Sequence, residues 1–142
     1  MKRVFLDTNI IMDTLEERRF SDSSKAVVSK GNEGRISLYA SLLSFVNIAY
    51  IRRKHPVDEI YNDLSQLRGI LNVVPIEDVQ LDAALDVRVK DFEDNIQFQC
   101  AKAAGCDVIV TNNVKDFAGL DGVDVMSSDD FLLDLFAEEE VG

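Results

Sequence analysis

The pattern of hydrophobic and polar positions along this chain alternates between short apolar runs and longer segments with helical periodicity. The short runs have the length of strands rather than of helices. They fall at residues 4–6, 36–38, 73–74, 108–110 and 123–126. Such runs, when helices separate them, are typical of strands that are buried on both faces of a parallel sheet.

Helices are predicted between the short runs. Ile60, Leu64, Leu67 and Leu71 recur at three- and four-residue steps, which places them on one face of a helix over residues 57–71. The other predicted helices start near residue 10 and at residue 128, or cover residues 23–32, 41–54, 78–89 and 92–104. The expected fold is therefore α/β, a three-layer sandwich in which helices flank a short parallel sheet on both faces.

Capping residues mark the ends of two predicted helices. Thr8 or Asn9 can cap the first helix, which would leave the carboxylate of Asp7 free. Asp91 is the expected N-cap of the helix over residues 92–104, and the glycine that follows this helix is its expected stop.

Length and charge limit the domain organisation and the partners. The 142 residues suit a single domain spanning residues 1–142, and 46% hydrophobic residues argue against disorder. The net charge of −11 is unfavourable for a nucleic-acid partner, but it is unevenly distributed. Residues 1–55 hold 10 Lys or Arg against 6 acidic residues, whereas residues 116–142 hold 9 acidic and no basic residues. A basic face can therefore coexist with the acidic C-terminal end.

Several protein classes are disfavoured by what the sequence lacks. Cys100 and Cys106 do not have the spacing of a zinc site, and His55 is the single histidine. Neither a GxSxG motif nor a glycine-rich phosphate loop occurs. No apolar stretch resembles a signal peptide or approaches the roughly 20 residues of a membrane span. The expectation is a soluble, cytoplasmic protein that does not bind membranes.

Candidate site residues stand just after two of the predicted strands. Asp7 follows the run 4–6, while the polar group 111–113 follows the run 108–110, with Asp116 three residues further on. In an open α/β sheet, ligands bind beyond the carboxyl ends of the strands, and parallel strands bring those ends to one edge. Asp, Thr and Asn also form turns and caps, so this alternative stays open for the second group.

Asp94 is a third candidate. On a helix it shares a face with Phe98 and Ala101, so its carboxylate leans toward the interior, where a cation would neutralise it. Asp94 is also placed to complete a capping box with Asp91, which is the structural alternative. Glu93 lies about 100° around the same helix from Asp94. It is expected either in solvent or in a supporting position behind the residues that would bind a cation.

Acidic side chains that share a site repel one another, by roughly 4 kcal/mol per pair at about 4 Å in a medium of effective dielectric constant near 20. A hard divalent cation removes that cost. Mg²⁺ or Mn²⁺ accepts oxygen ligands and can activate water for attack on a phosphoryl group. The acidic positions therefore predict metal-assisted hydrolysis of phosphodiester bonds.

Three blocks of this sequence resemble the signature motifs of the PIN-domain family. They are Val4-Phe5-Leu6-Asp7-Thr8-Asn9, Asp91-Phe92-Glu93-Asp94 and Val110-Thr111-Asn112-Asn113-Val114-Lys115-Asp116-Phe117. The resemblance implies a parallel sheet sandwiched by helices, Mg²⁺- or Mn²⁺-dependent cleavage of RNA, and frequent homodimers. It also implies the role of a toxin that is accompanied by a small antitoxin protein.

The resemblance implies which residues of this chain correspond to the four acidic positions of the family. Asp7 matches the first family acid and Asp94 the third. The fourth falls on Asn113 or Asp116, of which only Asp116 is charged. At the second position, where the family normally has a glutamate, this chain has Asn47.

Two functions follow from this match, and the asparagine keeps both open. The first is a metal-dependent ribonuclease whose metal ligands are Asp7, Asp94 and Asp116, with Asn47 as a neutral ligand or as a residue that positions water. The second is a PIN-fold binding module with weakened or no nuclease activity, which docks RNA or a protein partner. A structural alternative for Asn47 is a buried, hydrogen-bonded amide that joins helices.

Further residues are expected to support the site or to bind RNA. Those expected behind the ligands are Thr8, Asn9, Ser44, Glu93, Thr111 and Asn113. Arg52, Arg53 and Lys54 form the densest basic run of the chain and are expected to contact the RNA backbone. As an alternative, their charges complement the dipole at the end of the preceding helix.

Overall fold

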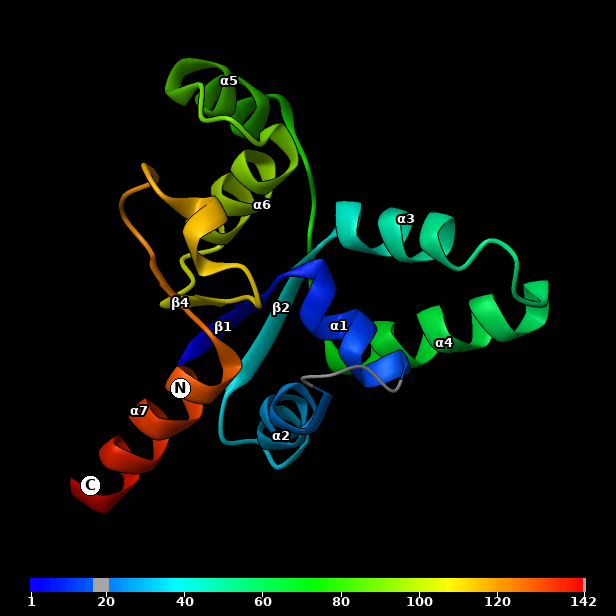
Figure 1. The fold of residues 1–142 in the computed structure, drawn as a ribbon, viewed down its shortest axis with the longest axis horizontal. Coiled ribbons are helices and arrows are strands. Elements are labelled where there is room, and N and C mark those ends of the chain that lie inside the picture. The colour runs from blue at the N-terminus through cyan, green and yellow to red at the C-terminus, as the bar shows by residue number, and fades with distance from the viewer. Residues whose placement is uncertain (17–20, 142) are drawn as a thin grey trace.

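A computed structural model of the protein describes residues 1–16 and 21–141, and within them the chain forms one sheet of five parallel strands. The strands are β1 (Arg3–Leu6), β2 (Ser37–Ser41), β3 (Asn72–Val74), β4 (Val108–Val110) and β5 (Asp124–Met126). Their spatial order is β3-β2-β1-β4-β5 (Figure 1). The apolar runs thus predicted every strand of this sheet, and the expected α/β fold is confirmed.

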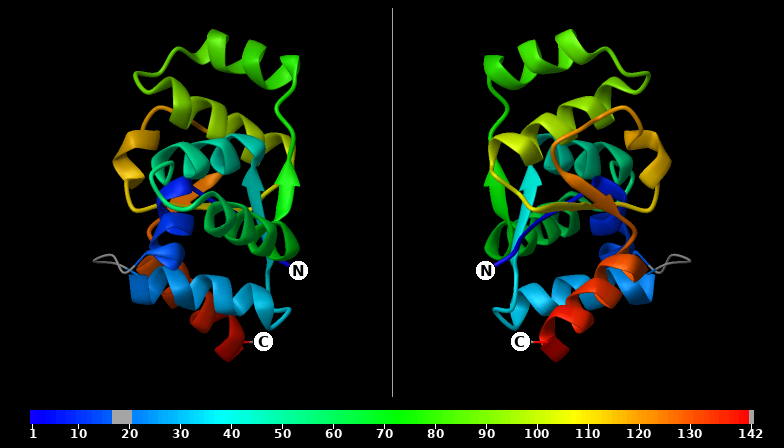
Figure 2. Two further views of the ribbon diagram at one scale, coloured as in Figure 1. Left: turned by 90° about the vertical axis from the view of Figure 1, so that its right-hand side faces the viewer. Right: turned by 90° about the vertical axis from the view of Figure 1, so that its left-hand side faces the viewer.

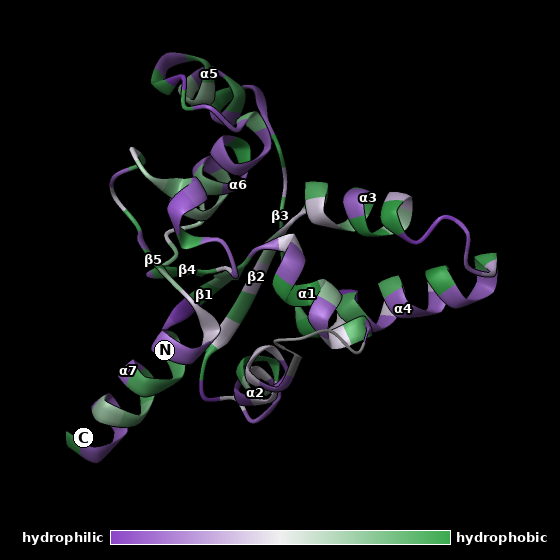
Figure 3. Ribbon diagram, viewed as in Figure 1, coloured by the Kyte–Doolittle hydropathy of each residue, from purple (hydrophilic) through white to green (hydrophobic). Residues whose placement is uncertain are grey.

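Helices connect the strands in the order that the periodicity predicts. They are α1 (Thr8–Leu15), α2 (Ser21–Asn32), α3 (Leu42–Ile51), α4 (Val57–Ile70), α5 (Asp78–Val87), α6 (Phe92–Ala103) and α7 (Ser128–Val141). A short 3₁₀ helix, η1 (Val114–Phe117), follows β4 and is not predicted, because four residues are too few to show a period. Along α4, apolar and polar segments alternate as an amphipathic helix requires (Figure 3).

The sheet lies between two hydrophobic cores. Because consecutive side chains of a strand point to opposite faces, Val4 and Leu6 of β1 enter one core and Phe5 enters the other. The first core contains residues of α1, α2, α4 and α7, and the second is packed against α5 and α6. Figure 2 shows α5 and α6 on one side of the sheet and α2 and α7 on the other. The three-layer sandwich expected from the sequence is present.

The strand order places a switch point at the middle of the sheet. β1 pairs with β2 on one side and with β4 on the other, and Leu6 is in register with Val110. The N–H of Asp7 donates a hydrogen bond to the carbonyl of Val110 (3.0 Å). The residues that follow β1 and β4 therefore share one edge of the sheet, which is where an open α/β sheet binds ligands.

Helix caps explain how the chain turns at this edge. Asp91 caps α6 as predicted, and Gly105 adopts the positive φ of +67° that favours glycine after a helix. The prediction for the first helix is wrong in one respect. Asp7 itself is the N-cap of α1, because its side chain accepts a hydrogen bond from the N–H of Thr8, and its carboxylate is not free. Across residues 1–16 and 21–141, no helix combines the length and apolar character needed to span a bilayer.

Candidate active site

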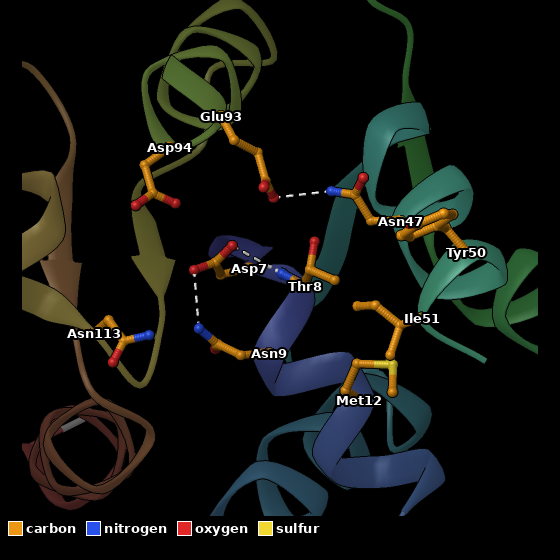
Figure 4. Close-up of a pocket in the computed structure, with 10 residues that line it drawn as sticks. All are labelled: Asp7, Thr8, Asn9, Met12, Asn47, Tyr50, Ile51, Glu93, Asp94 and Asn113. Carbon is orange, nitrogen blue, oxygen red and sulfur yellow. Dashed lines mark hydrogen bonds between the residues drawn. The ribbon is translucent and has the colours of Figure 1, made fainter. Parts of the chain in front are cut away.

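A pocket of about 400 Å³ opens at the edge where β1 and β4 end. Figure 4 shows that its side chains come from α1, α3, α6 and the loop after β4. The lining residues are Asp7, Thr8, Asn9, Met12, Asn47, Tyr50, Ile51, Glu93, Asp94 and Asn113. The pocket thus brings together the residues after β1, the loop after β4 and the helix that carries Asp94.

Asp7 enters the pocket directly after β1 and is held by three donors. Its carboxylate is 5% exposed and accepts hydrogen bonds from the N–H of Thr8 (2.8 Å), the side-chain amide of Asn9 (3.2 Å) and the hydroxyl of Thr111 (2.8 Å). Burial raises the pKa of Asp7, and the three donors act against that shift. Together they fix the orientation of the carboxylate.

Asp94 and Glu93 reach the pocket from the first turn of α6 (Figure 4). Asp91 accepts its capping hydrogen bond from the backbone N–H of Asp94 (2.9 Å), so the Asp94 carboxylate is left to face the pocket. Burial raises the pKa of Asp94 to about 7, and the negative charges of Asp7, Asp91, Glu93 and Asp116 contribute to this shift. The pKa of Glu93 is also raised, by burial first and then by Asp7 and Asp91. The pocket therefore collects negative charge that a cation would neutralise.

Asn47 faces the same pocket from α3. Its side-chain nitrogen donates a hydrogen bond to Oε1 of Glu93 (2.8 Å), which links α3 to α6 across the pocket (Figure 4). The Asn47 side chain is half-buried and lines the cavity, so it is not an amide enclosed in the core. Glu93 also lines the pocket and is exposed, which agrees with the expectation that it stands in solvent or behind the ligands.

The two candidates for the fourth acidic position lie in different places. Asn113 lines the pocket, and its N–H donates to the hydroxyl of Thr111 (3.1 Å), which itself donates to Asp7. Asp116 is exposed on η1 and is not among the lining residues. Its charge still contributes to the raised pKa of Asp94. Asp116 lines a neighbouring hollow together with Asp91 and Lys115, and its role as a metal ligand stays a prediction.

Buried polar side chains lie behind Thr8, and the sequence motifs do not indicate them all. Ser44 is fully buried, does not line the pocket, and its hydroxyl lies 2.8 Å from that of Thr8. Gln97 of α6 is also fully buried and donates to both hydroxyls. In the sequence, Gln97 is one polar residue on a mixed helix, and only its spacing of four residues from Glu93 points toward the site.

Comparison with known proteins assigns the chain to a family. The family model described as PIN domain matches residues 3–115, which include every residue that lines the pocket. The chain belongs to the PIN domain family. The resemblance of its three sequence blocks to that family is thereby confirmed.

Similar proteins match this PIN domain over nearly its whole length. Ribonuclease VapC1 of Aquifex aeolicus (strain VF5) is 26% identical over 136 residues, covering 92% of this chain and 93% of its own. The structure of VapBC2 from Rickettsia felis bound to a DNA fragment from their promoter is 15% identical and has a TM-score of 0.70. The match covers 88% of this chain and 98% of the chain in that structure. A toxin-antitoxin complex from Klebsiella pneumoniae is 21% identical, with a TM-score of 0.62 and coverages of 88% and 97%. The two structures confirm the fold.

The donor atoms of the PIN-domain pocket suit a hard divalent cation. Asp7 and Asp94 offer carboxylates, and Asn47 and Asn113 offer amide oxygens. In residues 1–16 and 21–141, no three acidic, cysteine or histidine side chains converge closely enough to hold a metal ion by themselves. The residues present therefore fit an ion held by one or two carboxylates together with water and substrate phosphate, as is usual for Mg²⁺.

The predicted RNA-binding run divides into one buried and two exposed residues. Arg52 is only 4% exposed, and its guanidinium pairs with Asp63 and with Glu59 (3.2 Å) of α4. The expectation that Arg52 contacts RNA is therefore not supported, because these carboxylates already neutralise it inside the protein. Arg53 and Lys54 are exposed, and the Arg53 guanidinium stacks on the ring of Tyr50 at 4.3 Å from its centroid.

Proposed function

We propose that this PIN domain is a ribonuclease that hydrolyses RNA phosphodiester bonds with Mg²⁺ or Mn²⁺. The observation that carries the proposal is the convergence of Asp7, Glu93 and Asp94 in one pocket at the switch point of the sheet. The raised pKa of Asp94 is in part a consequence of that convergence. The relative named Ribonuclease VapC1 supports the same activity.

The roles of the residues follow from their contacts. Asp7, held by three donors, would present a fixed carboxylate to a bound ion, and Asp94 lines the same pocket from α6. Asn113 adds an amide oxygen from the loop after β4. Asn47 orients Glu93 through its hydrogen bond, so that Glu93 can accept a proton from water that attacks the phosphate. The bound ion would supply Lewis-acid polarisation of the phosphoryl group and would make water more acidic.

Removal of divalent metal is expected to abolish activity. Purified protein incubated with single-stranded RNA and Mn²⁺ should give cleavage products, and an excess of EDTA should stop their formation because the acidic pocket cannot polarise phosphate without a cation. Adding Mn²⁺ back in excess should restore cleavage. A mock purification from cells without the protein controls for contaminating nucleases. Cleavage that continues in EDTA would exclude the proposed mechanism.

The binding module remains the second candidate, and Asn47 is the observation that favours it. Compared with the glutamate that the family normally has at this position, the amide of Asn47 lacks one negative charge, so the site attracts a metal ion less strongly. Thermal unfolding with and without Mn²⁺ separates the two, because an ion that binds only the native state at about 100 times its dissociation constant adds roughly 2.7 kcal/mol of stability. Unchanged melting in Mn²⁺, together with RNA binding that needs no metal, would favour the module.

A protein partner is also part of the proposal. The solved complexes that share this fold are named as VapBC and toxin-antitoxin assemblies, so we infer that this chain is a toxin with an antitoxin of its own. Homodimer formation stays a prediction. Exposed apolar side chains on α3 offer a surface for either contact; they are Leu42, Val46, Tyr50 and Ile51.

Neutralising Arg53 and Lys54 is expected to weaken RNA binding and its dependence on salt. Both are exposed, and Tyr50, on which Arg53 stacks, lines the acidic pocket. For each phosphate that no longer meets a positive charge, the slope of log affinity against log salt should fall by roughly 0.7 for single-stranded RNA. The measurement is fluorescence anisotropy of labelled RNA at several salt concentrations with the double variant Arg53→Gln/Lys54→Gln.

The matched control for this experiment removes the same charge elsewhere. Arg35→Gln/Arg68→Gln also lowers the positive charge by two, but Arg35 pairs with Glu33 and Arg68 bonds to the carbonyl of Leu71, and neither arginine lines the acidic pocket. The control should keep the wild-type slope. If both double variants gave the same slope of log affinity against log salt, Arg53 and Lys54 would face solvent and would not contact RNA.

A further inference from the structure

A closed hydrogen-bond network joins three elements of the fold behind the pocket. The side-chain nitrogen of Gln97 donates to the hydroxyls of Ser44 (3.0 Å) and Thr8 (3.3 Å), and these two hydroxyls lie 2.8 Å apart. The Gln97 carbonyl oxygen accepts a hydrogen bond from the hydroxyl of Ser41 (2.6 Å). Both ends of the amide are thus used, and Gln97, Ser41 and Ser44 are each 0% exposed.

Three members of this network, Thr8, Ser44 and Gln97, either line the pocket or lie within one helical turn of a residue that does. Thr8 directly follows Asp7 in α1, and Ser44 precedes Asn47 by one turn of α3. On α6, Gln97 follows Glu93 by four residues, a spacing that places the two on the same helical face. The network therefore connects the three helices that present Asp7, Asn47 and the acidic pair of α6.

The chemistry of the contacts makes this connection stiff. A primary amide and three buried hydroxyls satisfy one another, and a displaced helix would leave a buried donor or acceptor without a partner. Ser41 also accepts a hydrogen bond from the N–H of Ser44 (3.3 Å) as the N-cap of α3, which ties the start of that helix to Gln97. Small movements of α6 relative to α1 and α3 are thereby opposed.

We infer that Gln97 is a positioning residue of the metal site, which sets the separation of the Asp94 carboxylate from Asp7 and Asn47. The inference rests on the proposed function for the chemistry of the site. It concerns the geometry in which metal ligands are held, because metal affinity falls when oxygen ligands must be moved into place. Gln97 itself does not line the pocket and would therefore act through the residues that do.

The test replaces Gln97 with methionine, which is unbranched and apolar and removes all of the amide contacts. The Gln97→Met variant is expected to bind Mn²⁺ about ten- to a hundredfold more weakly in calorimetric titration, the range seen when residues behind metal ligands are changed. Ser44→Ala removes one acceptor of the network and should weaken Mn²⁺ binding in the same direction by a smaller factor. Combined, the two changes should be less than additive, because both act through the same contact.

Gln99 supplies the matched control on the same helix. It is 7% exposed, and its amide nitrogen bonds to Asn95 within α6 rather than to α1 or α3. Gln99→Met should therefore leave Mn²⁺ affinity at the wild-type value, whatever it does to the melting temperature. Each affinity is measured on protein that circular dichroism shows to be folded.

The outcomes separate this inference from the proposed function. Equal Mn²⁺ affinity in wild type, Gln97→Met and Ser44→Ala would overturn the role of Gln97, and so would an equal loss in Gln99→Met. A wild-type protein that binds Mn²⁺ but cleaves no RNA would overturn the proposed function alone. If Gln97→Met does not fold, Ser44→Ala and its Mn²⁺ affinity decide the question.

Discussion

Replacing Asp94 with asparagine is expected to lower kcat for cleavage of single-stranded RNA in Mn²⁺ by at least about a hundredfold, the scale on which a group that stabilises transition-state charge acts. The amide has nearly the same shape but no charge to hold the cation. Asp94 lines the pocket with its carboxylate, and α6 is capped through its backbone, which asparagine keeps. The loss should therefore be catalytic rather than structural.

The same substitution is expected to stabilise the metal-free protein. The pKa of Asp94 in the folded state is about 7, above its usual value of 3.8, so the folded state loses stability as pH rises from about 4 through 7. Asparagine does not ionise and escapes this loss. Because water screens the half-buried side chain, we expect a gain of about 1 kcal/mol at pH 8, or roughly 2–4 °C, and no gain near pH 4.

Asp86→Asn on α5 is the control for both measurements. Asp86 is exposed and does not line the pocket, so this variant removes one carboxylate from the protein without touching the site. Its kcat should equal that of the wild type, and its melting temperature in EDTA should differ little from that of the wild type at both pH 4 and pH 8. Full activity in Asp94→Asn would remove Asp94 from the mechanism, and loss of its fold would show that the carboxylate is structural.

The sheet and its switch point were predictable because they depend on apolar runs and on parallel pairing alone. Val4-Phe5-Leu6 and Val108-Ile109-Val110 are buried on both faces, so each reads as a continuous hydrophobic run. Once both are strands of one parallel sheet, Asp7 and Thr111 must emerge at the same edge. The hydrogen bond of 2.8 Å between their side chains is the outcome of that reasoning.

The places of two predicted site residues were not predictable, because side-chain direction depends on tertiary contacts. Of the two candidates for the fourth acidic position, Asn113 lines the pocket, whereas Asp116 is exposed on η1 and lines a neighbouring hollow. Arg52 belongs to a basic run, but it sits in the turn after α3 and folds back against carboxylates of α4. Neither a 3₁₀ turn nor an ion pair across a helix hairpin leaves a periodic signal in the sequence.

Gln97 illustrates a further limit. Its burial follows from the packing of α6 on β2 and its partners lie on α1 and α3, at sequence separations of 89 and 53 residues. A single glutamine on a helix is normally a surface residue. Only the three-dimensional arrangement shows that both ends of this amide are occupied.

Asn47→Glu is expected to strengthen metal binding and to weaken the metal-free fold. The amide nitrogen of Asn47 donates to Glu93 at 2.8 Å, and a glutamate would replace this hydrogen bond with a contact between two carboxylates. Without metal, this repulsion should lower the melting temperature by several degrees at pH 8, at roughly 2–4 °C per kcal/mol. With Mn²⁺, the added charge faces the cation, and we expect about tenfold tighter binding, equivalent to roughly 1.4 kcal/mol.

Asn47→Gln isolates the charge, because glutamine adds the same methylene group as glutamate but stays neutral. If the position belongs to the metal site, the glutamate variant alone should gain Mn²⁺ affinity in calorimetry, and its melting temperature should rise more steeply with added Mn²⁺ than that of either the wild type or the glutamine variant. If the position only joins α3 to α6, both variants should lose stability through the added methylene and neither should bind Mn²⁺ more tightly. The second result would take Asn47 out of the metal site and, with it, the main argument that this PIN domain has a weakened nuclease centre.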